Sequence, residues 1–252
     1  MRVYALCNQK GGVTKTTSAV NLAYGLARSG RRVLVIDTDA QSNSTYLLVG
    51  NLNQEPTLFD MLFKSARLAD IIVGTKQEGL YPAPSSLDLS TADMLMASAT
   101  GRERRFKRAV APVVEQFDYI LIETPPNLGI ITIHAFNACT GVLIPIALTT
   151  SARIGITIWE RTMQELRDTL EGPLPIFGVV ANLDDHTHMS ADVLDAVRQH
   201  YRKLVFNTVI PCNIKVEESH NRVAILYDSA PGSTGARAYA QLVSEVIHRA
   251  EG

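Results

Sequence analysis

Residues 8–17 read Asn-Gln-Lys-Gly-Gly-Val-Thr-Lys-Thr-Thr and combine glycine, lysine and threonine in the order of a phosphate-binding loop. Gly11 and Gly12 let the backbone bend where a Cβ atom would clash, so that successive N–H groups can point at phosphate oxygens. Lys15 is placed to reach the β- and γ-phosphates of a nucleotide, and the Thr16 hydroxyl is placed to bind Mg²⁺. The alternative is a plain glycine turn between a strand and a helix. The glycines, lysines and threonines of this run all stand in register, which argues against that alternative.

Two residues of this run depart from the ordinary loop, which is G-x-x-x-x-G-K-[ST]. Lys10 is a second lysine, and it stands too early in the run to act from the position of Lys15. Its presence predicts that this lysine contacts another phosphate, across a dimer. Thr14 stands where a glycine usually precedes the loop lysine. The Gly11–Gly12 pair can still supply the bend.

Carboxylates end two other apolar runs. Asp37 and Asp39 follow residues 33–36, and Glu123 follows residues 119–122. In a parallel α/β sheet, ligands bind beyond the carboxyl ends of the strands, so we expect these groups beside the loop. One carboxylate can orient the attacking water and another can steady the water shell of the metal. The alternative is that one of them caps the following helix, which is more plausible for Asp37 than for both.

Apolar runs alternate with helix-like spacing along the chain, which predicts the elements that position these residues. We expect strands near residues 2–7, 32–37, 79–83, 118–122, 141–147, 175–181 and 206–210. We expect helices to fill most of the gaps between them, for example at 16–28, 102–116, 155–170, 189–201 and 235–249, with loops concentrated at 50–56 and 72–90. The fold class is therefore α/β, with a mostly parallel twisted sheet, helices on both faces and one domain over residues 1–252.

The composition of the chain limits the classes of function that it can have. The chain has 252 residues, 46% of them hydrophobic, and a formal net charge of −1, so binding to DNA or anionic lipid would need a local patch. Three scattered cysteines, Cys7, Cys139 and Cys212, form no Cys-x-x-Cys pair and favour a reducing cytoplasm. The first strand leaves no room for a signal peptide, and no apolar run approaches the ~20 residues of a membrane span.

Four blocks of the sequence resemble the ParA/MinD ATPases, and the ParA/Soj branch in particular. The resemblance runs through nearly the whole chain. Residues 10–17 resemble the deviant Walker A box of this family, and residues 117–126 resemble its Walker B strand and second switch. The other two similar blocks are residues 33–43 and a last block that runs from residues 209–211 to 226–228 and 235–239. The resemblance implies the P-loop NTPase fold, ATP and Mg²⁺ as cofactors, and ATPase activity.

The resemblance also implies roles for single residues. Asp39 would position water, and Glu123, where the family usually has Asp, would act on Mg²⁺ through a water. Asn182 and Pro211 would hold the adenine, although a lone Asn after a strand is also a common turn residue. The expected ATP-binding set is Lys10, Gly11, Gly12, Val13, Thr14, Lys15, Thr16, Thr17, Asn182 and Pro211. The catalytic set is Lys10, Lys15 and Asp39, and the metal set is Thr16, Asp37 and Glu123.

A DNA-binding patch is expected to be thinned or rearranged. The basic run at residues 101–108 is interpreted as a solvated helix face. Residues 210–215 resemble a family stretch that contacts DNA; Lys215 keeps one basic position, and Cys212 loses another. The candidates for DNA contact are Lys215, Arg222, Arg202, Lys203 and Arg237. Phosphate contacts alone would give binding that is independent of sequence and sensitive to salt.

The leading hypothesis is a ParA-like ATPase that forms an ATP-dependent sandwich dimer and binds the nucleoid without sequence preference. It would position a chromosome, plasmid or protein cargo in the cytoplasm, with hydrolysis stimulated by a ParB-like or other adaptor. A MinD-like membrane ATPase is one alternative, but residues 240–252 lack the basic polar face of a membrane-binding helix. A metabolic enzyme on the same scaffold, such as an ATP-dependent synthase or a nitrogenase-like reductase, is another.

Overall fold

One parallel sheet of seven strands organises the fold. The computed structural model describes residues 1–8, 12, 14–96, 104–150, 152–166, 170–213, 215 and 224–252, without the side chains of residues 153 and 154. The sheet has the order β3-β2-β4-β1-β5-β6-β7, and all its paired strands are parallel. The strands are β1 (Val3–Leu6), β2 (Val33–Asp37), β3 (Leu80–Ala83), β4 (Tyr119–Glu123), β5 (Gly141–Ala147), β6 (Ile176–Asp184) and β7 (Val205–Pro211). The α/β fold and its seven predicted strands are thus confirmed.

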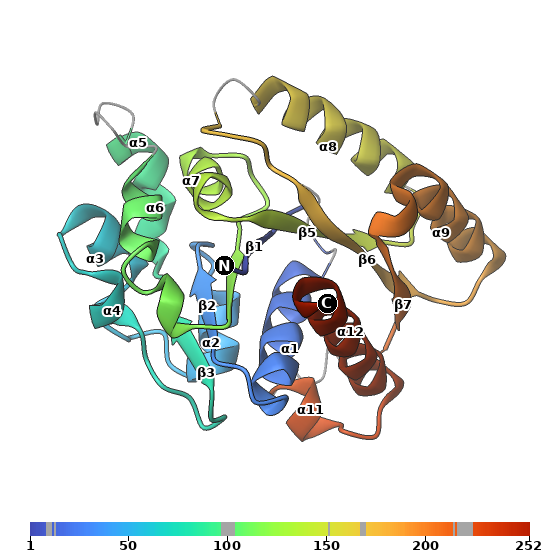
Figure 1. Cartoon of the computed structure of the whole chain (residues 1–252), viewed down its shortest axis with the longest axis horizontal. Helices are drawn as coiled ribbons and strands as arrows, with labels where there is room; N and C mark the ends of the chain where they lie inside the picture. The colour runs from blue at the N-terminus through green and yellow to red at the C-terminus, as the bar shows by residue number, and fades with distance from the viewer. Residues whose placement is uncertain are drawn as a thin grey trace.

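Helices cover both faces of this sheet, as Figure 1 shows. One face carries α1 (Lys15–Arg28), α2 (Asn43–Val49), α11 (Leu226–Ser229) and α12 (Thr234–Glu251). The other carries α3 (Leu58–Phe63), α4 (Leu68–Ile71), α5 (Ala92–Met96), α6 (Arg105–Val110), α7 (Ile130–Ala138), α8 (Ala152–Leu166) and α9 (His188–Tyr201). Short 3₁₀ turns are η1 (Leu87–Thr91), η3 (Val114–Gln116) and η4 (Arg202–Leu204).

Burial on both faces explains why the strands read as unbroken apolar runs. In β2, Val33 and Val35 pack toward α1 and α12, whereas Leu34 and Ile36 pack toward the helices of the opposite face. Alternate side chains of a strand point to opposite faces, so a strand covered twice needs apolar residues at every position. Asp37, the first polar residue of β2, ends the strand and is also buried.

The helix that follows the phosphate-binding loop is held close to the last helix of the chain. A Cβ atom at Gly25 of α1 would lie 2.5 Å from Cγ2 of Val243 in α12 and 2.6 Å from the hydroxyl oxygen of Tyr227. Only glycine therefore permits this approach of α1 to α12. The packing fixes the helix whose first turn carries Lys15 and Thr16.

The helix predictions were less complete than the strand predictions. The helix expected over residues 102–116 was partly wrong: its described part is α6, a turn containing Pro112, and η3. Proline lacks a backbone N–H and disrupts a helix interior, which accounts for the break. No range was predicted for the short helices α2, α3, α4, α5 and α11 or for α7, which is buried on most sides and whose apolar residues show almost no 3.6-residue period.

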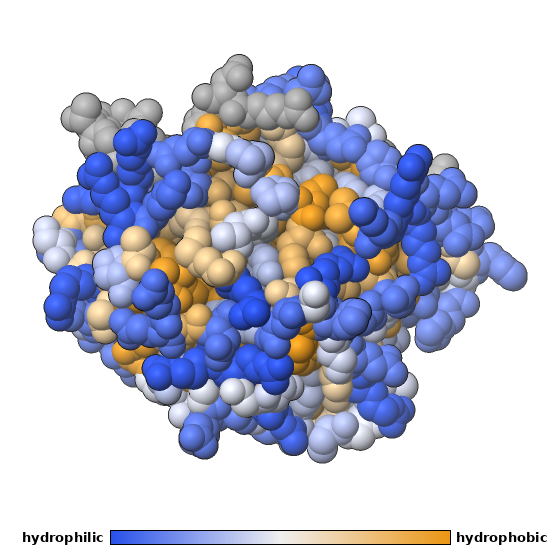
Figure 2. All heavy atoms as spheres, in the orientation of Figure 1, coloured by the Kyte–Doolittle hydropathy of each residue, from blue (hydrophilic) through white to orange (hydrophobic). Residues whose placement is uncertain are grey.

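The surface mixes polar and apolar side chains. Figure 2 shows one face of the molecule, where hydrophilic side chains form much of the rim and apolar ones reach the surface nearer the middle. Among the helices of the described ranges, none is both long enough and apolar enough to cross a membrane.

Candidate nucleotide-binding site

A cavity of about 470 Å³ lies at the edge of the sheet where the strands end, beside the first turn of α1. This volume lies within the range of small-molecule sites, roughly 300–1,000 Å³. The cavity brings together loop residues, two carboxylates and the end of β7. Its lining residues are Gly12, Thr14, Lys15, Thr16, Thr17, Asp39, Gln41, Asn43, Glu123, Pro126, Leu183, Ile210, Pro211, Cys212, Asn213 and Tyr239.

The backbone at the start of α1 has the shape of an anion site. Thr14 is the N-cap and adopts the left-handed conformation, with φ 64° and ψ 34°, and Lys15 begins the helix. A left-handed residue followed by right-handed ones turns consecutive N–H groups toward one point, where the helix dipole also favours negative charge. For a residue with a Cβ atom, this conformation costs roughly 1–2 kcal/mol.

Lys15 is buried and held against the base of the loop. Its Nζ donates a hydrogen bond of 3.1 Å to the carbonyl oxygen of Asn8. Burial lowers the pKa of the Lys15 ammonium, while the negative charges of Glu123 and Asp39 act in the opposite direction. The Nδ2 of Asn8 in turn donates to the carbonyl oxygen of Pro145 in β5 at 2.7 Å, which ties the start of the loop to the sheet.

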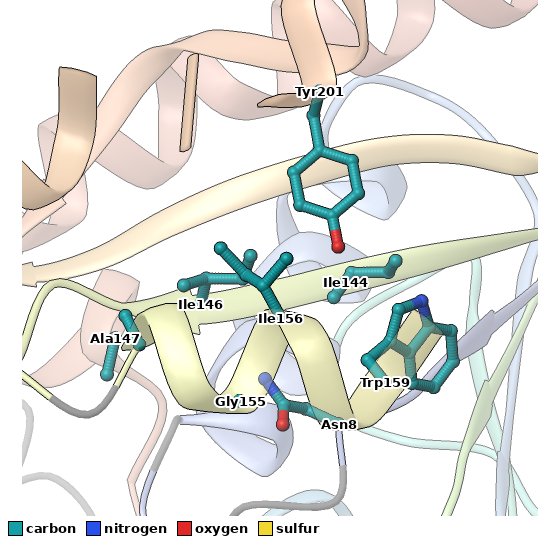
Figure 3. A pocket seen from close by; sticks show the side chains of 9 residues that line it. Asn8, Ile144, Ile146, Ala147, Gly155, Ile156, Trp159 and Tyr201 are labelled. Carbon is teal, nitrogen blue, oxygen red and sulfur yellow. The ribbon is translucent and has the colours of Figure 1, made fainter. Parts of the chain in front are cut away.

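A much smaller apolar cavity, of about 20 Å³, lies behind Asn8 between β5 and α8. Figure 3 shows its lining, with the hydroxyl of Tyr201 pointing toward Ile144 and Trp159. That hydroxyl is buried, and no group in the described ranges hydrogen-bonds to it. The space is about that of one water molecule, so it does not compete with the larger cavity as a nucleotide site.

Glu123 joins the end of β4 to the loop. The Thr16 hydroxyl donates a hydrogen bond to Oε1 of Glu123. Oε2 has no partner of standard geometry within the described residues, although the Ser44 hydroxyl lies near the carboxyl. Burial, together with the charge of the neighbouring Asp37, raises the pKa of Glu123 to about 8.

Asp37 is engaged by the backbone around it. Its Oδ2 accepts hydrogen bonds from the backbone N–H and the hydroxyl of Thr45, at 2.9 and 2.7 Å, and its Oδ1 accepts from the N–H of Asp39 at 3.1 Å. Burial raises the pKa of Asp37 to about 6, although these hydrogen bonds stabilise the charged carboxylate and act to lower the pKa. Thr45 lies in the first turn of α2, so this geometry supports the capping alternative, and the metal role of Asp37 stays a prediction.

The oxygen donors at the bottom of the cavity suit Mg²⁺. Hydroxyl and carboxylate oxygens are the ligands that this ion prefers, and it commonly keeps several waters while bound by one or two carboxylates and substrate phosphates. Thr16 and Glu123 provide such a pair. Among the described side chains, no group of three or more His, Cys, Asp and Glu could hold a metal, so an all-protein cage is absent from that part of the chain.

Asp39 lines the cavity two residues after Asp37, which pairs with Glu123 between β2 and β4. Its Oδ1 accepts from the backbone N–H of Gln41 at 3.0 Å. Its carbonyl oxygen accepts from the N–H of Ser42 at 2.9 Å and from the Ser85 hydroxyl at 2.6 Å. These bonds fix the segment, which leaves the carboxylate at the border of the cavity where a water could meet a nucleotide.

The end of the cavity away from the carboxylates contains Pro211 but not Asn182. Pro211 lines the cavity with Leu183, Ile210, Asn213 and Tyr239, and its strand β7 lies on the other side of β1 from β2 and β4. Asn182 is fully buried within β6, and its Nδ2 donates to the hydroxyl oxygens of Thr14, at 2.6 Å, and Ser18, at 3.2 Å. The adenine roles of Pro211 and Asn182 stay predictions, and only Pro211 is on the cavity wall.

Sequence reasoning assigned no site role to several residues of this wall. Gln41 and Asn43 lie in the family-like block at residues 33–43, which also contains Asp39. Their place beside Asp39 on the cavity wall could have been inferred from that block. Leu183 gave no comparable signal, because an apolar residue late in a strand reads as core. Tyr239 lies in the family-like block at residues 235–239, but a tyrosine in a helix also reads as core.

The structure separates the candidate DNA contacts into two groups. Lys215 follows Asn213 of the cavity wall, and Arg237 is exposed in the first turn of α12. Arg202 and Lys203 are exposed in η4, before β7, and so lie at the opposite end of that strand, ~20 Å away at about 3.3 Å per residue. Arg222 lies outside the described residues, as do Lys10, Gly11 and Val13 of the loop.

The chain is similar to a protein family and to known proteins over most of its length. A family model described as an AAA domain matches residues 1–176. The chain is 38% identical over 249 residues to the sporulation initiation inhibitor protein Soj of Bacillus subtilis, covering 97% of this chain and 98% of that protein. It is 37% identical over 255 residues to the chromosome partitioning protein ParA of Caulobacter vibrioides, covering 99% and 95%.

Solved structures with bound nucleotide share the fold. Cobyrinic acid a,c-diamide synthase from Mycobacterium smegmatis, with bound ADP and magnesium, matches with a TM-score of 0.84 and 29% identity over 98% of this chain and 94% of that chain. An ATP complex of McdA from Cyanothece matches with a TM-score of 0.86 and 25% identity over 98% and 96%. Both similarities cover almost the whole of this chain.

Proposed function

Because the chain belongs to the ParA/Soj family of P-loop ATPases, we propose that it is a partition or positioning ATPase whose ATP-bound dimer binds DNA. The observation that carries this proposal is the shared wall of one cavity. Residues 14–17 of the loop, Asp39, Glu123 and Pro211 meet there, in a volume that accommodates a nucleotide.

In this proposal the phosphates of ATP lie on the backbone N–H groups at the start of α1. By a short movement, the Lys15 ammonium would leave the carbonyl oxygen of Asn8 and donate to phosphate oxygens instead. A charged acceptor would then replace a neutral one. The Thr17 side chain borders the same space. The adenine would lie toward Pro211, between the ends of β6 and β7.

Mg²⁺ would be held through Thr16 and Glu123, with Asp37 supporting the surrounding water shell. The ion, when bound, neutralises charge that develops on the phosphates. Asp39 would hold the attacking water beside the γ-phosphate, since it lines the cavity on the carboxylate side and its segment is fixed by three hydrogen bonds. These groups together would give Mg²⁺-dependent hydrolysis of ATP to ADP and phosphate.

Lys10 would act in the partner subunit of a sandwich dimer. A second lysine at the start of the loop can supply positive charge to phosphates bound by the other copy, where it would stabilise the transition state. The expected result for Lys10→Ala is nucleotide binding without dimerisation or stimulated hydrolysis. Lys15→Ala is the matched control, because it should lose nucleotide binding itself. Normal stimulated turnover in Lys10→Ala would contradict this role.

The dimer would bind nucleoid DNA through basic residues that are too sparse on one copy. An adaptor of the ParB type, or another partner, would then stimulate hydrolysis and release the DNA. Cytoplasmic location and association with the nucleoid follow from this cycle. The support for it is the similarity to Soj and ParA over almost the entire chain.

The test is a gel shift with two unrelated DNA duplexes at fixed salt, without nucleotide and with ADP or ATP. Asp39→Ala serves as the form in which hydrolysis is blocked. We expect both duplexes to bind only with ATP, and Asp39→Ala to hold them longer than the wild type. Absence of binding in every state would refute the DNA-based cycle, and liposome binding would then test the MinD-like alternative.

A metabolic synthase is the second candidate, because the fold and 29% of the aligned residues are shared with a protein described as cobyrinic acid a,c-diamide synthase. The identity to Soj is higher, at 38%. The two functions differ in what stimulates ATP turnover. Stimulation by a carboxylic acid substrate, without DNA or an adaptor, would favour the synthase.

A further inference from the structure

Thr14 holds a backbone conformation that threonine rarely adopts, at the point where the loop becomes α1. Its φ of 64° lies in the left-handed region, where a β-branched residue is an outlier. Glycine enters this region without steric cost, and the ordinary loop has glycine at this position. A threonine that stays there must therefore be restrained by its surroundings.

A buried polar cluster from two other elements provides the restraint. Asn182 of β6 is fully buried, and its Nδ2 donates to the Thr14 hydroxyl oxygen at 2.6 Å and to the Ser18 hydroxyl oxygen at 3.2 Å. From α12, the fully buried Tyr239 places its hydroxyl 3.3 Å from that of Ser18. Buried amides and hydroxyls are costly to leave without partners, so this cluster resists movement of the Thr14 side chain.

We propose that Asn182, supported by Tyr239, is a positioning residue that fixes Thr14 in the left-handed conformation and thereby shapes the phosphate-binding loop. The inference rests on the proposed function in one respect, namely that this loop binds nucleotide phosphates. With Thr14 left-handed, the N–H groups at the start of α1 converge on one anion. If Thr14 relaxed to the β or right-handed region, those groups would diverge and phosphate binding would weaken.

A positioning role for Asn182 and a contact of Asn182 with adenine predict different effects on ligands with and without a base. A residue that shapes the loop affects every ligand bearing the phosphate chain, with or without a base. A residue that contacts adenine affects only ligands that contain the base. The location of Asn182, inside β6 with its amide on the loop and off the cavity wall, favours the first role.

The experiment is a double-mutant cycle on the full chain, with Asn182→Ala, Thr14→Gly and the double variant. The dissociation constants of ADP and of inorganic tripolyphosphate, each with Mg²⁺, would be measured by calorimetry. We expect Asn182→Ala to weaken both ligands about tenfold, which is the order of the left-handed penalty of threonine. Thr14→Gly provides the reference background, and Asn182→Ala measured against that background should cost less than about twofold.

Tyr239→Phe keeps the ring and removes only the hydroxyl, so it covers the case in which Asn182→Ala fails to fold. We expect a weakening of about threefold for both ligands, again suppressed by Thr14→Gly. Thermal melting would confirm that each variant is folded.

Three results would overturn the inference, and they differ from one another. A loss for ADP alone, in both backgrounds, would show that Asn182 contacts the base. Equal losses for both ligands with no suppression by Thr14→Gly would show a general packing role. If the wild type bound neither ligand, the proposed function would fail as well.

Discussion

The hydroxyl of Thr16, in the first turn of α1, donates a hydrogen bond to Oε1 of Glu123 at the end of β4. This bond places the loop and the strand end against each other at the bottom of the cavity, where Mg²⁺ is expected. Because Glu123 is also buried beside Asp37, its charge state depends on whether a cation is present to balance it.

The first prediction concerns the carboxylate of Glu123. Glu123→Gln keeps the size of the side chain but removes the negative charge, so we expect Mg²⁺-dependent ATP hydrolysis to fall by roughly 10–100-fold. Glu123→Asp is the matched control, since it keeps the charge and shortens the chain by one methylene. It should retain most of the activity, with a changed Mg²⁺ optimum. Phosphate release measured across a Mg²⁺ titration distinguishes the two, and equal activity of Glu123→Gln and wild type would exclude Glu123 from the metal site.

The second prediction is that the protein without metal or nucleotide becomes less stable as the pH rises from 6 to 8. Burial raises the pKa of Glu123 from 4.5 to about 8, so in this window the folded chain holds a proton that the unfolded chain has released. Stability therefore falls with rising pH, by up to about 1.4 kcal/mol per unit and about 2 kcal/mol across the window. For a chain of this size that corresponds to roughly 4–8 °C in Tm.

Thermal melting in EDTA at pH 6, 7 and 8 measures this dependence. Glu123→Gln cannot ionise, so its Tm should change less with pH than that of the wild type. Asp37, whose pKa is raised to about 6, contributes in the same direction but mainly below this window. An identical slope for wild type and Glu123→Gln would show that other groups cause the dependence.

The strands and the phosphate-binding loop could be predicted from the sequence because local patterns determine them. Runs such as residues 33–36 are apolar at every position, and the loop has a fixed spacing of glycine and lysine. The hydrogen bond between Asn182 and Thr14 could not be predicted, because the two residues are 168 positions apart in the sequence. The capping of α2 by Asp37 depends likewise on where Thr45 lies in three dimensions, although the sequence had left capping open for that residue.

The third prediction uses the three cysteines to report on the cavity. Cys212 is exposed and lines the cavity, whereas burial raises the pKa values of Cys7 and Cys139 to about 12. Since the thiolate is the reactive form, a maleimide should label Cys212 selectively. Saturating ADP with Mg²⁺ should slow that labelling by about tenfold or more by covering the thiol. Mass spectrometry identifies the labelled residue, with Cys212→Ser as the control.

An unchanged rate of labelling in the presence of ADP would mean that the nucleotide does not reach the end of β7. That result would move the adenine away from Pro211 while leaving the phosphate end of the site intact. Labelling of Cys7 would contradict its burial beneath the loop.

The last prediction separates the two groups of basic residues. Lys215 and Arg237 lie near the edge of the sheet that holds the cavity, where a sandwich dimer would bring two copies together, whereas Arg202 and Lys203 lie at the far end of β7. Paired charge reversal, Lys215→Glu with Arg237→Glu, should weaken ATP-dependent DNA binding at least tenfold and reduce its salt dependence. Arg202→Glu with Lys203→Glu is the matched control for net charge and should change binding by less than about twofold. The affinity for ATP should be unchanged in both, which shows that only the DNA contact is altered. If the control pair lost DNA binding and the first pair kept it, the patch would lie at the far edge, and the dimer would have to present that edge to DNA.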